Sequence, residues 1–252
     1  ISEGADINAV QNVSFDIYSG EVFGLVGESG SGKSTVVQAM MRILPPPALI
    51  SGGKVLINNQ DIMTASPSDI IGFRWKQISI VMQSALNALN PVLSIREQIN
   101  DVLATHGGLT GEDANDRAKE LLSLVDLDPQ RLDSYPHQLS GGMKQRVVIA
   151  IALAIMPPII IMDEPTTALD VIVEREIISK IIELRKKLGF TILFITHDLN
   201  LLLEFVDRLA IMKDGEIVEL DGVANIQKGG RHVYTKKLIS SIPSASGQRE
   251  KG

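Results

Sequence analysis

An eight-residue glycine-rich segment constrains this chain more than any other feature. Gly27-Glu28-Ser29-Gly30-Ser31-Gly32-Lys33-Ser34 fits the pattern G-x-x-x-x-G-K-[ST], after an apolar run, Val22 to Val26, and before a helical stretch from Lys33 to about Leu44. Glycines let backbone N–H groups converge on phosphate oxygens, and the following helix points its N-terminus at the same anion. The segment therefore predicts a phosphate-binding loop, which an ATPase, a kinase or a GTPase can equally contain.

The residues at the end of this loop have separate expected roles. Lys33 is predicted to neutralise the β- and γ-phosphates, and the Ser34 hydroxyl to ligate Mg²⁺. Thr35, in the first turn of the helix, belongs to the same predicted nucleotide site.

A second apolar run ends in two adjacent carboxylates. Ile159 to Met162 has the character of a buried strand, and Asp163 and Glu164 follow it directly. The carboxyl ends of parallel strands meet at one edge of a sheet, where the phosphates are also expected. Asp163 is therefore predicted to hold Mg²⁺ through water. Glu164 faces elsewhere because strand side chains alternate, and we expect it to act as general base on a water in line with the γ-phosphate.

A second helix start offers another anion site. Ser140-Gly141-Gly142 precedes a helical run and supplies a hydroxyl, bare backbone N–H groups and a helix dipole. One chain has no evident need for two such sites on one nucleotide. Two chains arranged head to tail do need both, because the second site of one chain would cover the γ-phosphate held by the other. An ordinary helix start with Ser140 as N-cap is the simpler alternative.

The remaining pattern alternates strands and helices, which favours an α/β fold with a mostly parallel sheet. Few strand signals occur between Pro91 and about Ala154, so we expect a helical lobe there. Further expected elements are strands at Val13–Ile17, Val55–Ile57, Ile78–Met82 and Phe190–Ile195, a helix at Val171–Leu188, and a hairpin from Arg208 to Leu220 around Asp214-Gly215.

Composition excludes several classes of protein. The net charge of −6 is unfavourable for a protein whose main partner is nucleic acid. The absence of cysteine excludes disulfides and cysteine-based metal sites. No apolar run approaches the roughly 18 to 20 residues of a membrane-spanning helix, so a role at a membrane would require partners.

These motifs, in this order, resemble the ATP-binding subunits of ABC transporters. Leu139 to Arg146 has the form Leu-Ser-Gly-Gly-x-x-Gln-Arg, the signature of that family. Gln83 follows a strand as the family's Q-loop glutamine does, Ala168-Leu169-Asp170 resembles the D-loop, and His197 resembles the switch histidine. The resemblance extends from about Val13 to Leu220.

The resemblance implies an ATPase that uses ATP and Mg²⁺, with Lys33, Gln83, Glu164 and His197 in catalysis. Gln83 would sense Mg²⁺ and the attacking water, and His197 would contact the γ-phosphate. Ser140, Gly141 and Gly142 would act on the ATP of the opposite subunit, and Asp170 would cross the dimer interface.

The fold that the resemblance implies is α/β, with a P-loop NTPase core, a mostly parallel sheet, an N-terminal antiparallel β part and an inserted helical lobe. Residues 1–252 would form a single ABC ATPase domain. The core would comprise residues 1–90 and 155–225, the lobe about 91–154, and a C-terminal tail 226–252, loose from Ser240 onward.

One branch of the family is especially similar. Ser84 to Val92 resembles the Leu-Asn-Pro segment of oligopeptide and dipeptide importer ATPases, which also serve nickel and some sugar systems. His232 to Pro243 resembles the tail of the same branch. The resemblance therefore implies peptide import, with nickel or sugar import as the alternative. Cysteines beyond the domain in this branch can carry an iron–sulfur cluster, and we expect none here because the chain lacks cysteine.

The implied partners are two transmembrane permease subunits, a second ATPase subunit (identical or related) and, indirectly, an extracellular solute-binding protein. The implied location is peripheral, at the cytoplasmic face of the cell membrane. Two other hypotheses are a soluble ABC protein acting on DNA or ribosomes and a non-hydrolysing regulatory module. The acidic charge and single ATPase domain disfavour the first, and intact Lys33, Glu164 and His197 disfavour the second.

Overall fold

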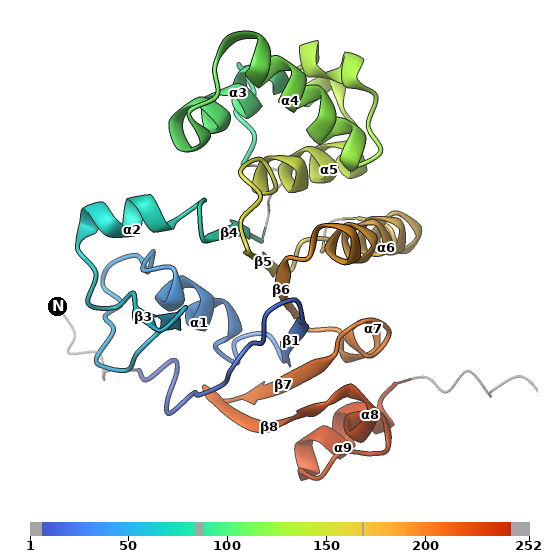
Figure 1. Ribbon diagram of the computed structural model, residues 1–252. Coiled ribbons are helices and arrows are strands. Elements are labelled where there is room, and N and C mark those ends of the chain that lie inside the picture. Colours follow the sequence, from blue (N-terminus) through green and yellow to red (C-terminus); the bar gives the residue numbers. More distant parts are fainter. Residues whose placement is uncertain (1–6, 84–87, 168, 243–252) are drawn as a thin grey trace, which may run out of the picture.

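A six-stranded sheet forms the centre of the computed structural model, in the order β4-β5-β6-β1-β7-β8 (Figure 1). All neighbouring pairs are parallel except β7 with β8. The strands are β1 (Val22–Gly27), β4 (Ile78–Val81), β5 (Ile159–Asp163), β6 (Thr191–Thr196), β7 (Arg208–Lys213) and β8 (Glu216–Gly222). The predicted α/β fold with a mostly parallel sheet is confirmed.

The structure describes residues 7–83, 88–167 and 169–242. Predictions that concern the start of the segment after Gln83, Ala168 of the D-loop, and the last part of the C-terminal tail lie outside those residues.

Helices cover both faces of the sheet. In Figure 1, α1 lies on one face, and α6 and α7 lie on the other. The helices are α1 (Lys33–Met40), α2 (Pro67–Phe73), α3 (Ile95–Gly107), α4 (Gly111–Leu124), α5 (Gly141–Ala152), α6 (Val171–Leu188), α7 (Leu199–Leu203), α8 (Val223–Gln227) and α9 (Val233–Ser240), with short 3₁₀ turns at Pro129–Asp133 and Pro136–Gln138.

Strand β1 is buried along its whole length, and its alternating side chains contribute to two separate hydrophobic cores. Phe23 and Leu25 pack in the core beneath α1. Val22 and Val26 pack on the opposite side, in the larger core shared with α5, α6 and the helices inserted before them. Because both faces of the strand are covered, its sequence is continuously apolar, as expected for a central parallel strand.

The helices α3, α4 and α5 stand together above the sheet, between β4 and β5 in the sequence (Figure 1). Helix α3 begins with a capping box, in which Ser94 accepts the Glu97 N–H and the Glu97 side chain accepts the Ser94 N–H. Its buried residues Ile95, Ile99 and Leu103 follow the spacing of one helix face. These local features account for the start of α3 and for its buried face.

The segment Val13–Ile17 differs from its prediction, because the structure assigns no strand there. Its side chains keep the predicted alternation, with Val13, Phe15 and Ile17 partly buried and Ser14 and Asp16 exposed. The antiparallel part that does form near the N-terminus is the short pair β2 (Leu56–Ile57) and β3 (Gln60–Asp61). Alternation predicted the inward face of the segment correctly but not a pairing partner.

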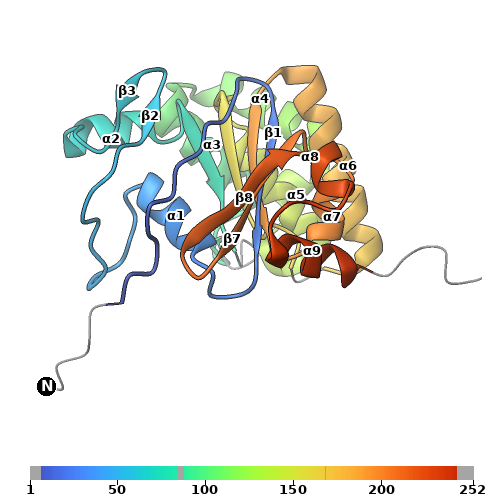
Figure 2. The same ribbon diagram turned by 90° about the horizontal axis from the view of Figure 1, so that it is seen from below.

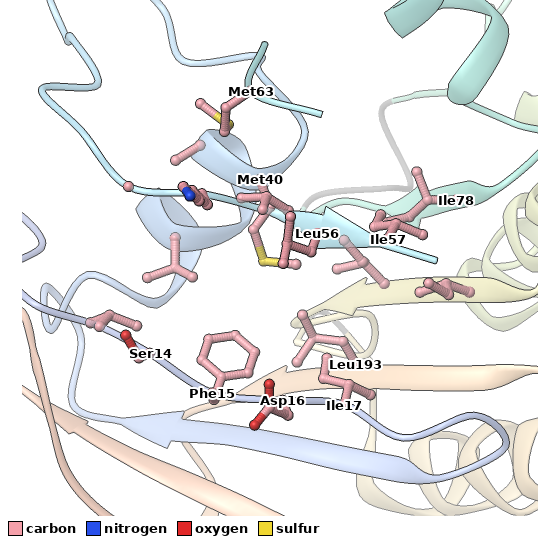
Figure 3. A pocket seen from close by; sticks show the side chains of 18 of the residues that line it. Ser14, Phe15, Asp16, Ile17, Met40, Leu56, Ile57, Met63, Ile78 and Leu193 are labelled. Carbon is pink, nitrogen blue, oxygen red and sulfur yellow. The ribbon is translucent and has the colours of Figure 1, made fainter. Parts of the chain in front are cut away.

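A cavity of about 840 Å³ lies between this extended segment, α1 and β2. Figure 3 shows Phe15, Met40, Leu56 and Leu193 around it. Phe15 also stacks on Phe23, with ring centroids 5.2 Å apart. The lining of this cavity is mostly apolar and includes none of the predicted site residues, so this cavity is not the predicted nucleotide site.

Helix α1 ends at Met40 rather than near Leu44, as the sequence had indicated. Arg42 adopts a positive φ of 51°, which stops the helix before the prolines. The Arg74 guanidinium donates to the carbonyl oxygens of Met41 at 2.8 Å and Arg42 at 3.0 Å. A residue more than thirty positions away thus satisfies the carbonyls at the helix end.

The region predicted as a tail from residue 226 is folded at least as far as residue 242. Helix α9 packs against α7, and Ile226, Tyr234 and Thr235 are buried. Seen from below in Figure 2, α9 lies beside the end of β1 from which the chain continues to α1.

Candidate functional site

The glycine-rich loop connects β1 to α1, as its sequence context predicted. Gly30 and Gly32 have φ values of 80° and 99°, which residues with a side chain rarely adopt. A Cβ atom on Gly27 would lie 2.3 Å from the Met212 carbonyl oxygen of β7, so this position also needs glycine for close packing. The loop geometry therefore depends on its glycines.

Lys33 lies within the loop and is only 5% exposed. Its ammonium group donates to the carbonyl oxygens of Gly27 and Glu28, both at 2.8 Å. Burial lowers the pKa of Lys33, whereas the negative charges of Glu164 and Asp163 oppose that shift. The loop therefore holds its lysine with backbone carbonyls, close to two carboxylates.

Asp163 ends strand β5 and is 3% exposed. The Ser34 hydroxyl donates to its Oδ1 atom at 3.1 Å. Burial raises the pKa of Asp163 and the neighbouring Glu164 charge adds to the rise, against the lowering effects of Ser34 and Lys33. The structure thus brings together two residues, 129 positions apart, that the sequence assigned to one Mg²⁺ site.

Glu164 is the residue on which the other predicted side chains converge. Its Oε2 atom accepts a hydrogen bond from Gln83 Nε2 at 3.1 Å, and its Oε1 atom lies 3.2 Å from His197 Nδ1. Gln83 follows β4, Glu164 follows β5 and His197 follows β6, so three neighbouring strand ends supply the group.

The backbone of Glu164 is unusual, with a φ of 46° that non-glycine residues rarely adopt. Its N–H donates to the Ile195 carbonyl oxygen at 2.9 Å, which joins this turn to β6. Local strain that the surrounding structure maintains is common at functional sites, because it fixes a side chain in one direction.

Sequence reasoning missed the contribution of Thr167 to this group. The Thr167 hydroxyl lies 3.1 Å from both the Oε2 atom and the backbone oxygen of Glu164. Thr166 hydrogen-bonds in the other direction, to Glu174 of α6. The two threonines follow the acid pair closely in sequence, and this proximity could have indicated their role in the site.

The second predicted anion site lies at the start of α5. The exposed Ser140 is the N-cap and accepts the Met143 N–H at 3.3 Å, which is the simpler role considered for it. A Cβ atom on Gly142 would lie 2.7 Å from a methyl group of Val173, so α5 and α6 meet closely here. Within the described part of the chain, no hydrogen bond joins Ser140, Gly141 or Gly142 to the phosphate loop.

Asp170 has a clear local role as the N-cap of α6. Its Oδ1 atom accepts the N–H groups of Ile172 at 3.1 Å and Val173 at 3.0 Å. The residue is exposed, as are the apolar side chains of Val171 and Ile172 that follow it. The predicted contact across a dimer interface stays a prediction.

Comparison with known proteins places this site in a family. The family model for ABC transporters matches residues 10–167. The oligopeptide transport ATP-binding protein OppD of Bacillus subtilis is 41% identical over 252 residues, which is 98% of this chain and 70% of that protein. The dipeptide transport ATP-binding protein DppD of the same organism is 42% identical over 243 residues, 95% of this chain and 72% of that protein.

A solved structure agrees with these relatives. The ATP-binding cassette MJ0796, a dimer in a post-hydrolysis state bound to ADP and Pi, superposes with a TM-score of 0.76 at 34% identity. The match covers 88% of this chain and 94% of that one. Because the family model covers more than half of the sequence and similarity to the relatives extends over nearly all of it, this chain belongs to the ABC transporter family and is one of its ATPases.

Proposed function

We propose that this chain hydrolyses ATP to power a peptide importer. The observation that carries the proposal is the convergence of Gln83, Thr167 and His197 on Glu164, next to the Ser34–Asp163 pair and the buried ammonium of Lys33. These groups supply the functions that phosphoryl transfer to water requires: charge neutralisation, metal binding, and a base that positions the water.

In the proposed reaction, the ATP phosphates lie against the backbone N–H groups of residues 27–35. Lys33 exchanges its contacts with the Gly27 and Glu28 carbonyls for contacts with the β- and γ-phosphates. Glu164 accepts a proton from a water in line with the γ-phosphate, Gln83 orients that water, and His197 contacts the γ-phosphate.

The chemistry of the donor set suits Mg²⁺, which takes oxygen ligands and usually few of them from protein. Ser34 and Asp163 already place a hydroxyl and a carboxylate 3.1 Å apart, and Gln83 is the third residue proposed for the site. Mg²⁺ bound there would neutralise charge on the β- and γ-phosphates.

Two copies of the ATPase are proposed to act together, as a homodimer or with a related partner chain. Ser140, Gly141 and Gly142 of each subunit would face the ATP bound by the other, and Asp170 would lie at the interface. The exposed apolar start of α6 at Val171 and Ile172 supports the idea that this surface becomes covered.

Transport requires further subunits. Within the described ranges, no helix combines the length and the apolar character needed to cross a bilayer. We propose two permease subunits as partners, a location at the cytoplasmic face of the membrane, and an extracellular solute-binding protein that selects the cargo. The names of the relatives OppD and DppD support peptides as that cargo.

A pull-down from detergent-solubilised membranes of the source organism tests the proposed function. The bait is tagged Glu164→Gln in ATP and Mg²⁺, which should arrest the assembly before hydrolysis. The matched control is the double variant Lys33→Ala, Glu164→Gln, which should bind ATP poorly. Recovery of two polytopic proteins and a peptide-binding protein with the bait supports peptide import. Recovery of ribosomes, DNA-associated proteins or the bait alone would overturn it.

A further inference from the structure

The turn that carries Glu164 is joined to helix α6 by one pair of side chains. The Thr166 hydroxyl donates a hydrogen bond to the Oε1 atom of Glu174, which lies in the first turn of α6. Thr166 is only 4% exposed, and Glu174 is partly buried. A buried hydroxyl without an acceptor is unfavourable, whereas a carboxylate acceptor makes one of the stronger hydrogen bonds in proteins. The pair therefore holds the turn at a fixed place against α6.

The next residue of the same turn contacts the candidate base. The Thr167 hydroxyl lies 3.1 Å from both the Oε2 atom and the backbone oxygen of Glu164. Because Thr166 and Thr167 are adjacent, a displacement of Thr166 also displaces Thr167 and its contact with the Glu164 carboxylate. Glu174 is thus connected to the base through two consecutive residues, without touching it.

Helix α6 is a firm anchor for this contact. Its residue Ile177 is buried in the larger hydrophobic core. A Cβ atom on Gly142 would lie 2.7 Å from a methyl group of Val173, so the first turn of α6 also packs closely on the start of α5. The Glu174 N–H donates to the Asp170 carbonyl oxygen at 2.9 Å, within the regular helix. Glu174 is therefore a fixed reference point for the turn that it holds.

The ordinary pairing of a helical glutamate does not account for Glu174. Three and four residues further along α6, where a basic side chain could pair with it, the chain has Ile177 and Ile178. Among the residues that the structure describes, Thr166 is the side chain that hydrogen-bonds to the Glu174 carboxylate, and no lysine or arginine forms an ion pair with it. A negative charge near the start of α6 also suits the helix dipole, and the test must separate that role from the hydrogen bond.

We propose that Glu174 is a positioning residue for ATP hydrolysis, which holds the Glu164 carboxylate in place through Thr166 and Thr167. The inference rests on the proposed function, in which Glu164 is the base. Within the described ranges, no hydrogen bond joins Thr166 or Glu174 to the phosphate loop, so ATP binding should not depend on this pair. Loss of the pair should therefore lower kcat and leave the KM for ATP nearly unchanged.

The test uses the full chain with Glu174→Ala and Thr166→Val, alone and together, and with the conservative variants Glu174→Gln and Thr166→Ser. Glutamine keeps an acceptor oxygen without the charge, and serine keeps the donor hydroxyl. Valine has nearly the shape of threonine, so Thr166→Val removes the contact even if Glu174→Ala proves unstable. Glu176→Ala is the matched control, because Glu176 is an exposed carboxylate on the same helix.

The readouts are kcat and KM of phosphate release, Tm, and the ring-nitrogen NMR signals of isotope-labelled histidine. The His197 Nδ1 atom lies 3.2 Å from Glu164 Oε1, so its signal reports the position of the Glu164 carboxylate without any hydrolysis. Loss of one signal in His197→Ala assigns it among the four histidines of the chain.

We expect Glu174→Ala and Thr166→Val each to lower kcat about tenfold to a hundredfold, as for a small misplacement of a reacting group, and to move the His197 signal. Their KM should stay within about twofold of the wild type, as should kcat in Glu174→Gln, Thr166→Ser and Glu176→Ala. The double variant should lose no more than the worse single variant, since both substitutions remove the same contact.

An unchanged kcat or an unmoved His197 signal in Glu174→Ala and Thr166→Val would contradict the proposal. So would losses that multiply in the double variant. Equal losses of kcat in Glu174→Gln and Glu174→Ala would assign the effect to charge at the helix start and exclude the hydrogen bond as its cause. If the wild-type chain releases no phosphate, the proposed function fails, while the histidine signal still decides whether Glu174 positions Glu164.

Discussion

Replacement of Glu164 by glutamine should slow ATP hydrolysis while leaving the structure of the site unchanged. Glu164 Oε2 accepts from Gln83 Nε2 and Thr167 Oγ1, each at 3.1 Å, and Oε1 faces His197 Nδ1 at 3.2 Å. A glutamine amide can keep its oxygen toward the first two donors and turn its NH₂ group toward the imidazole nitrogen. All three contacts then persist, with the histidine nitrogen as acceptor.

The expected magnitudes follow from that geometry. Because no partner is left unsatisfied, the free energy of unfolding should change by less than about 1 kcal/mol. An amide cannot accept the proton of the attacking water, and general base catalysis contributes about a hundredfold to ten-thousandfold in rate. Turnover should therefore fall by about that factor while ATP still binds, and the variant should accumulate as an ATP-bound dimer.

Phosphate release at saturating ATP and Mg²⁺ measures turnover, thermal melting measures stability, and light scattering after gel filtration in ATP measures the dimer. Glu176→Gln is the control, since Glu176 is an exposed carboxylate on α6 whose ion pair with Arg146 is long, at 3.5 Å. It should retain full turnover. The assignment of Glu164 as base is refuted if Glu164→Gln keeps turnover within tenfold of the wild type. A large loss of stability would instead show that glutamine does not preserve the contacts.

Three further expectations concern other parts of the chain. Lys33→Ala should weaken binding of a fluorescent ATP analogue at least about tenfold, since a charge-assisted contact is lost, and unchanged affinity would contradict the phosphate-loop assignment. Burial raises the pKa of Asp163 in the folded state, so its ionised form costs stability at neutral and alkaline pH, and the cost disappears as pH falls through the raised folded pKa. Asp163→Asn should accordingly raise Tm most at about pH 8 and least at about pH 4, whereas a uniform gain would exclude this origin. His106→Ala should move the fluorescence emission of Trp75, the sole tryptophan, to longer wavelength, because it removes the His106 ring, whose centroid lies 5.2 Å from that of the Trp75 ring. An unchanged spectrum would argue against the stack.

The phosphate loop was predictable because its information is local. The glycines, the lysine and the following helix are adjacent in sequence, and each has a conformational reason to be there. The acid pair was predictable for a related reason, since a buried parallel strand must deliver Asp163 and Glu164 to the same sheet edge as the loop. Gln83 and His197 were assigned only by family resemblance, and the structure brings both within hydrogen-bond distance of Glu164.

Features that depend on distant contacts were not predictable. The carbonyls at the end of α1 accept hydrogen bonds from Arg74, which lies more than thirty residues later in the chain. The extended segment Val13–Ile17 has the side-chain pattern of a strand, but pairing depends on a partner that alternation does not reveal. The start of α9 is held by the buried Glu219 of β8, whose two backbone donors, Arg231 and His232, cannot be inferred from a polar C-terminal sequence.

The order of strands in the sheet has a consequence for how the protein is made. Strand β1 is flanked by β6 and β7, and the Gly20 N–H at its edge donates to a threonine hydroxyl 171 residues later. A ribosome that adds about 5 to 20 residues per second needs roughly 9 to 34 seconds to cover that interval. During that interval, Val22–Gly27 is an apolar segment whose neighbouring strands β6 and β7 have not yet been synthesised. A nascent chain of this protein therefore presents a binding site for chaperones long before it can bind nucleotide.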